Sequence, residues 1–185
     1  ECEVLRLLNG EGCLHAYGLE EWKNSFLLIM EDFQGQPLSR LIPSQGLPLG
    51  HFLTLAVEVT DCVNKLHSKG LIHKDINPNH ILVEPKWSKV RLVGLGIAGR
   101  PGPPPYIQQH LNDSLPYMSP EMTGRTSRNV DFPADIYSLG ITFYQMLTGR
   151  LPFASEDPME WIHWHMAKEP APPWMVNQTI PKPVS

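Results

Sequence analysis

Residues 51–69 carry the clearest periodic pattern in this sequence. Their apolar side chains recur at intervals of three and four residues, which places them along one face of an α-helix. Glu58, Asp61 and Lys65 fall outside that face, and Gly70 follows where a helix C-terminus favours a positive φ. The pattern predicts a scaffold helix that buries a stripe made up of Phe52, Leu55, Ala56, Val59, Val63 and Leu66.

Composition places this helix in a globular protein. The 185 residues are 42% hydrophobic, enough to bury a core as one domain or as part of a larger one. The net charge of −4 and the lack of a basic cluster exclude a nucleic-acid surface and a polybasic membrane anchor. The longest apolar run, residues 26–30, is far shorter than the roughly 18 residues of a membrane span, so we expect no span in this segment. Three cysteines without C-x-x-C spacing indicate reduced thiols and a cytoplasmic location.

Residues 73–82 follow the helix and read H-K-D-I-N-P-N-H-I-L. Pro78 fixes its own φ and favours an extended residue before it, so this loop is stiff. The stretch resembles the catalytic loop of protein kinases, H-R-D-L-x-x-x-N. The resemblance implies that Asp75 is the base that accepts the proton of a substrate hydroxyl. It also implies that His73 is a structural histidine and that Leu82 forms the floor under an adenine ring.

The same resemblance shows departures at the positions that hold magnesium. His80 stands where the family has the metal-binding Asn of the catalytic loop, and Gly94 stands where D-F-G has its Asp, 19 residues after Asp75. Residues 94–96 therefore read as a degenerate D-F-G. Asn77 also replaces a Lys that contacts the transferred phosphate in serine/threonine kinases. The family implies ATP and Mg²⁺ as cofactors, but we expect no metal ligand at these two positions because Mg²⁺ prefers oxygen ligands.

Residues 26–30 form a short apolar run that predicts a buried strand. A strand followed by E-D-F resembles the hinge of a kinase, where backbone groups read the edge of the adenine. The resemblance implies that Met30 lies at the back of an adenine pocket and that Glu31 and Phe33 line it.

Residues 1–8 predict an amphipathic helix that ends at Asn9 and Gly10. The helix resembles the end of the family's helix C, in which Glu1 would pair with a lysine of the small lobe. No counterpart of that lysine or of the glycine-rich loop is found in the sequence. We expect residues 1–32 to be the remnant of a small lobe and residues 33–185 to be a large lobe truncated before the last helices.

The segment 97–121 resembles a kinase activation segment that closes in Ser-Pro-Glu instead of A-P-E. Its first part is rich in Gly and Pro and predicts a loop. The resemblance implies structural roles for Ser114, near the catalytic Asp, and for Glu121 in the closing motif.

Two further helices are expected near the end of the chain. Residues 133–147 have an apolar stripe and end at Thr148-Gly149, and the resemblance implies that Asp135 ties this helix to the backbone of the catalytic loop. Residues 157–168 begin with an Asp, a Pro and a Glu in the order of a helix start. The predicted stripe of the first helix consists of Ile136, Leu139, Gly140, Phe143 and Leu147.

Three stretches, residues 72–78, 117–125 and 137–144, resemble the kinase-like domain that opens multi-sensor hybrid histidine kinases. The resemblance covers nearly the whole chain and implies an α+β, protein-kinase-like fold, mostly the helical large lobe with a truncated small lobe. It further implies a signal-transduction protein of the two-component type.

Three functions stay open on these residues. The first is a catalytically impaired kinase-like domain, a pseudokinase, that binds a protein substrate or regulatory protein domains of a signalling protein. The second is an active ATP-dependent serine/threonine protein kinase whose metal has unusual ligands. The third is a non-functional gene fragment.

Overall fold

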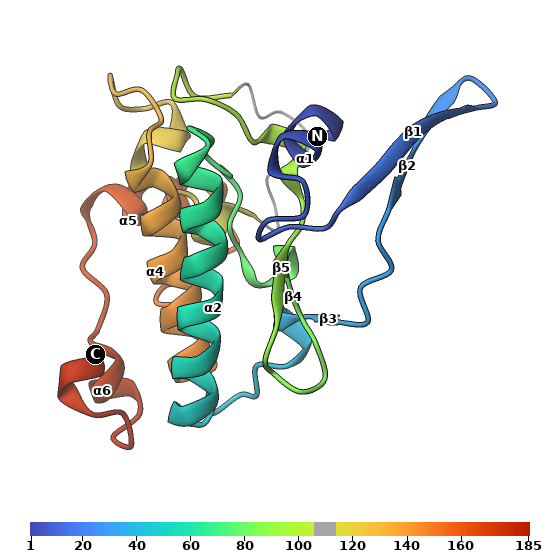
Figure 1. The fold of residues 1–185 in the computed structure, drawn as a ribbon. Coiled ribbons are helices and arrows are strands. Elements are labelled where there is room, and N and C mark those ends of the chain that lie inside the picture. The colour runs from blue at the N-terminus through green and yellow to red at the C-terminus, as the bar shows by residue number, and fades with distance from the viewer. Residues whose placement is uncertain (106–113) are drawn as a thin grey trace.

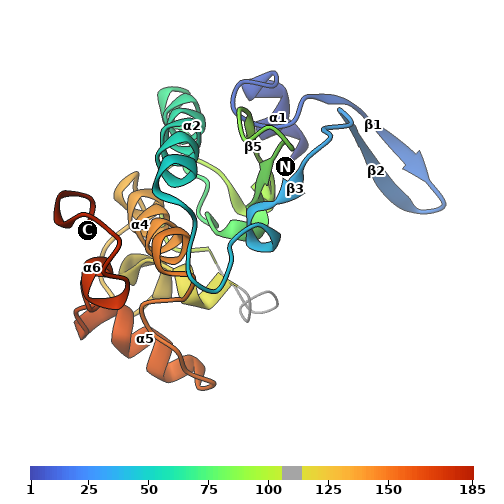
Figure 2. The same ribbon diagram turned by 90° about the horizontal axis from the view of Figure 1, so that it is seen from below.

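The computed structural model describes residues 1–105 and 114–185 of the chain. Two long helices, α2 (Leu49–Ser68) and α4 (Pro133–Thr148), lie side by side at the centre (Figures 1 and 2). A three-stranded sheet lies beside α2, and a two-stranded hairpin projects away from the body. This mixture of helices and small antiparallel sheets is the α+β class expected from the sequence.

Helix α2 confirms the predicted scaffold. Five residues of the stripe are buried and Ala56 is half-buried, while Gly70, which follows the C-cap residue Lys69, adopts a φ of 72°. If each buried side chain stabilises the fold by about 1.5–3 kcal/mol, the stripe contributes on the order of 10 kcal/mol before the loss of entropy. All of the stripe except Leu66 packs in the main core with other parts of the fold, among them Leu38, Ile81, Val83, Leu92, Met146 and Leu147.

Helix α4 begins and ends where the sequence predicted, with Gly149 at φ 74° after it. The predicted stripe was wrong at two positions, because Ile136 is 55% exposed and Gly140 is exposed too. Most sides of α4 are covered, so burial extends to polar residues that an apolar stripe does not include. The hydroxyls of buried Ser138 and Thr142 donate to the backbone carbonyl four residues earlier, at 3.1 and 2.9 Å, and are thereby satisfied.

The hairpin consists of β1 (Ala16–Trp22) and β2 (Ser25–Met30), joined through Lys23 and Asn24 at positive φ. The strand predicted at residues 26–30 is present, but the prediction that it is buried was wrong: Phe26 is 71% exposed. The hairpin is a sheet of its own, and no other described element covers the outer part of it (Figure 1). An apolar run identifies a strand, but it does not show whether a second layer packs on that strand.

The second sheet connects β3 (Gln36–Pro37), β4 (Ile81–Val83) and β5 (Val90–Leu92) in antiparallel order. Strand β4 begins within the predicted catalytic loop, whose last two residues it includes, and β5 leads into Gly94 at φ 74°. Helix α1 (Cys2–Leu8) ends at Asn9 in the left-handed region, as predicted. Its buried face packs with the end of α2 in a second cluster that includes Leu5, Leu8, Cys13, Leu66, Leu71 and Leu95.

The C-terminal part consists of α5 (Pro158–Ala167) and the short α6 (Pro173–Val176). Asp157 caps α5 by accepting a hydrogen bond from the backbone N–H of Met159 at 2.8 Å, as the start signal predicted. All three cysteines are free thiols, and burial raises the pKa of Cys13 and Cys62 to about 11. In residues 1–105 and 114–185, no helix is long and apolar enough to cross a membrane.

Candidate active site

The loop predicted to be catalytic connects the end of α2 to β4. Ile72 pairs with Gly99 through two backbone hydrogen bonds of 2.8 and 3.0 Å, which close the loop against the start of the predicted activation segment. Lys74 has a φ of 69°, and Pro78 opens the 3-10 turn η2 (Pro78–His80). The loop is therefore held at its start by backbone pairing and at its end by a short turn.

Asp135 anchors this loop from α4. Its fully buried carboxylate accepts hydrogen bonds of 2.8 Å from the backbone N–H groups of His73 and Lys74. The contact between helix and loop expected from the sequence is thus present. Nε2 of His67, at the end of α2, lies 2.8 Å from the same carboxylate. A buried carboxylate needs such donors, because an unpaired charge in the interior is destabilising.

His73 has a structural position. It is fully buried; Nε2 donates to the carbonyl oxygen of Val93 at 3.0 Å, while Nδ1 accepts from the backbone N–H of Asp75 at 3.3 Å. One nitrogen donates and the other accepts, so the ring is neutral. Burial lowers the pKa of His73, which favours the same neutral form. His73 therefore connects the end of β5 to the loop.

Asp75 is oriented by Asn77. The side-chain amide of Asn77 donates to Oδ1 of Asp75 at 3.0 Å, and its oxygen accepts from the backbone N–H of Asn79 at 2.9 Å. Asn77 is 1% exposed, whereas the side chain of Asp75 keeps 18% of its surface exposed. One buried amide thus caps η2 and leaves the Asp75 carboxylate partly open to solvent.

His80 and Gly94, the two residues that we expected at the magnesium positions of the family, lie against one another. Nδ1 of His80 donates to the backbone carbonyl oxygen of Asp75 at 2.8 Å, since a carbonyl can only accept. The ring lies against Gly94: a Cβ added at residue 94 would stand 2.6–2.7 Å from three ring atoms of His80. The imidazole therefore fills the space that any side chain at position 94 would need.

These residues do not fit a magnesium ion. Gly94 offers no carboxylate, and the nitrogen of His80 that is nearest to Asp75 already binds a carbonyl oxygen. Mg²⁺ requires oxygen ligands in octahedral geometry. No group of three or more His, Cys, Asp or Glu side chains that could hold a metal ion is found in residues 1–105 and 114–185.

Three of the four residues predicted for an adenine pocket lie around Arg91. Its Nε donates to the Glu31 carboxylate at 3.2 Å, its guanidinium stands 5.6 Å from the centre of the Phe33 ring, and its backbone pairs with Leu82 across the sheet. Met30 is 38% exposed at the end of β2, so the position that we predicted at the back of a pocket is open to solvent.

The remaining predicted residues lie further out. Glu1 is exposed and precedes α1, and Ser114 is half-buried before the turn η4 (Leu115–Tyr117). Glu121 is half-buried in the turn η5 (Pro120–Thr123); burial, with a contribution from this carboxylate, raises the pKa of Tyr137 to about 12. Residues 106–113 of the predicted activation segment lie outside the described residues.

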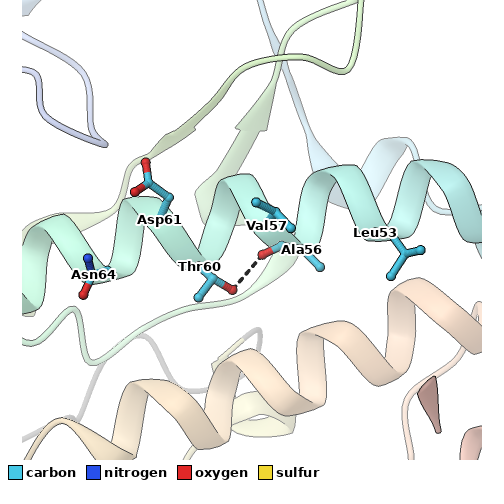
Figure 3. Close-up of a pocket in the computed structure, with 6 residues that line it drawn as sticks. All are labelled: Leu53, Ala56, Val57, Thr60, Asp61 and Asn64. Atoms are coloured by element: carbon cyan, nitrogen blue, oxygen red, sulfur yellow. Dashed lines mark hydrogen bonds between the residues drawn. The ribbon is translucent and has the colours of Figure 1, made fainter. Parts of the chain in front are cut away.

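One open pocket lies on the outer face of α2, away from the loop. Figure 3 shows its lining side chains along the helix, where the hydroxyl of Thr60 donates to the carbonyl of Ala56 at 2.7 Å. Asp61 is the one ionisable residue among those lining it, and it pairs with Lys65 at 2.5 Å. This surface has no constellation for catalysis. Its lining consists of Leu53, Ala56, Val57, Thr60, Asp61 and Asn64.

A loop with a partly open aspartate, fixed to a buried helix by a second aspartate, fits the phosphate-transferring enzymes that the sequence resembles. A family model described as the protein kinase domain matches residues 1–183. The chain belongs to the protein kinase family.

Several known kinases are about 30% identical in sequence to this kinase domain. A probable serine/threonine-protein kinase of Clostridium perfringens is 32% identical over 158 residues, which cover 83% of this chain and 22% of the relative. Serine/threonine-protein kinase Pkn1 of Myxococcus xanthus is 31% identical over 187 residues, covering 97% and 26%. Hybrid signal transduction histidine kinase G of Dictyostelium discoideum is 29% identical over 205 residues, covering 73% and 6%. The chain spans about a quarter or less of the length of these relatives.

Sequence reasoning missed three residues of this kinase domain. It treated Asn77 as the loss of a lysine, although the amide holds Asp75, and it overlooked His67 on Asp135 and Arg91 between Glu31 and Phe33. The Asn-Pro pair gave a usable signal for Asn77, because Asn before a turn often accepts from the backbone two residues on. His67 and Arg91 contact residues that are distant in the sequence, and nothing in their local sequence indicates these contacts.

Proposed function

We propose that this kinase domain is a binding or regulatory module of a signal-transduction protein and that its phosphoryl transfer is impaired. The observation that carries the proposal is the packing of the His80 ring into the space beside Gly94. Phosphoryl transfer depends on positioning the reactants and on neutralising the charge of the phosphates. Metal ions supply most of that neutralisation. Losing one such electrostatic interaction costs on the order of 3 kcal/mol, roughly a hundredfold in rate.

The rest of the large-lobe framework supports a module that keeps its shape. Asp135 holds the loop backbone, and His73 joins the loop to β5 without using a charged group. These contacts do not require phosphoryl transfer, so they are consistent with a domain whose role is recognition. Its partners would be a protein substrate or regulatory domains of the same signalling protein in the cytoplasm. A relative that is named a hybrid signal transduction histidine kinase supports the signalling role.

An active ATP-dependent serine/threonine kinase is the second candidate. The orientation of Asp75 by Asn77 favours it, because a general base must be held near the proton that it accepts. The two bacterial relatives described above are named serine/threonine kinases. This alternative needs Mg²⁺ to be bound by ligands other than the side chains at positions 80 and 94.

A thermal-shift titration with ATP, with and without Mg²⁺, separates the two candidates when it is paired with a radiolabelled phosphate-transfer assay. The proposed module gives no magnesium-dependent shift and no transfer that Asp75→Ala abolishes. A shift of several degrees in Mg²⁺, together with transfer that is lost in Asp75→Ala, would establish the active kinase. Asp61→Asn is the matched control, because Asp61 is an exposed carboxylate on α2 that pairs only with Lys65 in the described structure.

A further inference from the structure

We propose that His80 and Gly94 form one interdependent unit in which the imidazole takes the place of a divalent ion. The site formed by Asp75, His80 and Gly94 then binds no divalent ion, and it can gain one only when both residues are exchanged together. The inference rests on the proposed function and deepens it, because it states why the metal is lost and what would restore it.

The first step is steric. A Cβ at residue 94 would lie 2.6 Å from Cδ2 and 2.7 Å from Cγ and Nε2 of His80. Carbon atoms attract one another at about 3.5–4.0 Å, so these separations are strongly repulsive. No side chain larger than hydrogen fits at position 94 while the ring stays in place.

The second step is that the ring is fixed. Its Nδ1 is bound to the carbonyl oxygen of Asp75, and its face stacks on His73 with ring centres 6.1 Å apart and an angle of 30°. The backbone of His80 is also held. Its N–H donates to the carbonyl oxygen of Asn77 at 3.0 Å, and its carbonyl oxygen accepts from the backbone N–H of Val93 at 3.0 Å. The imidazole cannot swing away from Gly94 without breaking one of these contacts.

The third step concerns the ligand set. A carboxylate introduced at position 94 alone collides with the ring, and an amide introduced at position 80 alone has no carboxylate opposite it. Only the double exchange places an amide oxygen and a carboxylate beside Asp75, and oxygen atoms of these kinds are the ligands that Mg²⁺ and Mn²⁺ accept. Metal affinity and stability should therefore both be non-additive across this pair.

A double-mutant cycle tests the pair in the full chain. The variants are His80→Asn, Gly94→Asp and the two combined, each measured for its thermal midpoint and for binding of Mn²⁺ alone by calorimetry. Gly94 has a φ of 74°, which strains any other residue, but this strain is present in both backgrounds and cancels in the cycle. Gly96→Ala is the matched control, because a Cβ there meets no atom within 4 Å.

We expect Gly94→Asp to lower the midpoint by about 5 °C more in the His80 background than in the His80→Asn background. We also expect Mn²⁺ binding in the double variant and in neither single variant. Equal effects of Gly94→Asp in both backgrounds would overturn the proposal, as would Mn²⁺ bound at this site in the unaltered chain. The midpoints do not depend on phosphate transfer. A chain that shows the coupling and binds no Mn²⁺ at this site, but still transfers phosphate, therefore refutes the proposed function and leaves this pair standing.

Discussion

The carboxylate of Asp135 lies 2.8 Å from the backbone nitrogen of His73, a residue 62 positions earlier in the chain. The other carboxylate oxygen binds the next backbone nitrogen, that of Lys74, at the same distance. One buried side chain of α4 therefore sets the start of the loop that carries Asp75. The loop depends on a helix that is distant in sequence, so its shape should be sensitive to this carboxylate.

Asp135→Asn is expected to destabilise the chain by about 3 kcal/mol, a fall in thermal midpoint of roughly 10 °C. An amide has one accepting oxygen where the carboxylate has two. Its NH₂ group would face a buried backbone N–H of His73 or Lys74, so that a donor would meet a donor. Thermal or urea unfolding measures the change. Asp61→Asn, on the exposed face of α2, is the control and should lower stability by less than about 1 kcal/mol. An equal loss in both variants would contradict the anchoring role.

The parts of the fold that the sequence could predict are those in which one local pattern decides the outcome. Helix α2 has a single buried stripe and a glycine at its end, and α5 has an Asp cap and a Pro in its first turn. The burial of the strand at residues 26–30 could not be predicted, because an apolar run fixes the strand and not the layer against it. Helix α4 was misread at Ile136 and Gly140, which are exposed, because several elements pack on α4 and a single apolar stripe does not describe which of its residues they bury.

The candidate site was predictable where a residue acts within its own motif. The order H-K-D located His73 and Asp75, and the spacing located His80 and Gly94. The steric relation between the last two was not predictable, because it depends on β5 returning beside the loop and on the left-handed backbone at Gly94. The spacing predicts that residues 80 and 94 stand at the metal-ligand positions of the family. Only the packing shows that the His80 ring fills the space that a side chain at position 94 would need.

Asn77→Ala should lower stability by about 1–2 kcal/mol, because the turn η2 loses its cap and a buried polar partner is left unpaired. The same change removes the amide that orients Asp75. Urea unfolding gives the magnitude. Asn79→Ala is the matched control: Asn79 is exposed, and only its backbone N–H takes part in the cap. A larger loss in Asn79→Ala than in Asn77→Ala would show that the cap is misassigned.

Acid should destabilise the fold through its buried histidines. His165 accepts from the hydroxyl of Tyr137 and donates to the carbonyl of Leu115, both at 2.8 Å, and burial lowers its pKa as it does that of His73. The unfolded chain therefore binds more protons than the folded chain below a pH of about 6.5, and stability falls as the pH drops through that value. Unfolding free energies measured from pH 7.5 to 5 should show this loss, with a smaller slope in His165→Gln. His163→Gln, at an exposed position on the same helix, should keep the slope of the unaltered chain.

The β1–β2 hairpin should drive self-association. Its strands have unpaired outer edges in the described structure, and β2 contains no charged residue while Phe26 and Ile29 are 71% and 40% exposed. Exposed apolar edge strands pair with other chains, and a lysine on such a strand opposes that pairing. The double change Phe26→Lys and Ile29→Lys should therefore shift the chain toward monomer in sedimentation velocity and leave the thermal midpoint within about 2 °C.

Val57→Lys is the control, because it places the same charge on the open pocket of α2 (Figure 3), where the residue is 68% exposed but the backbone is paired within the helix. If Val57→Lys abolished association and the hairpin variant did not, the self-associating surface would be that face of α2 and not the hairpin.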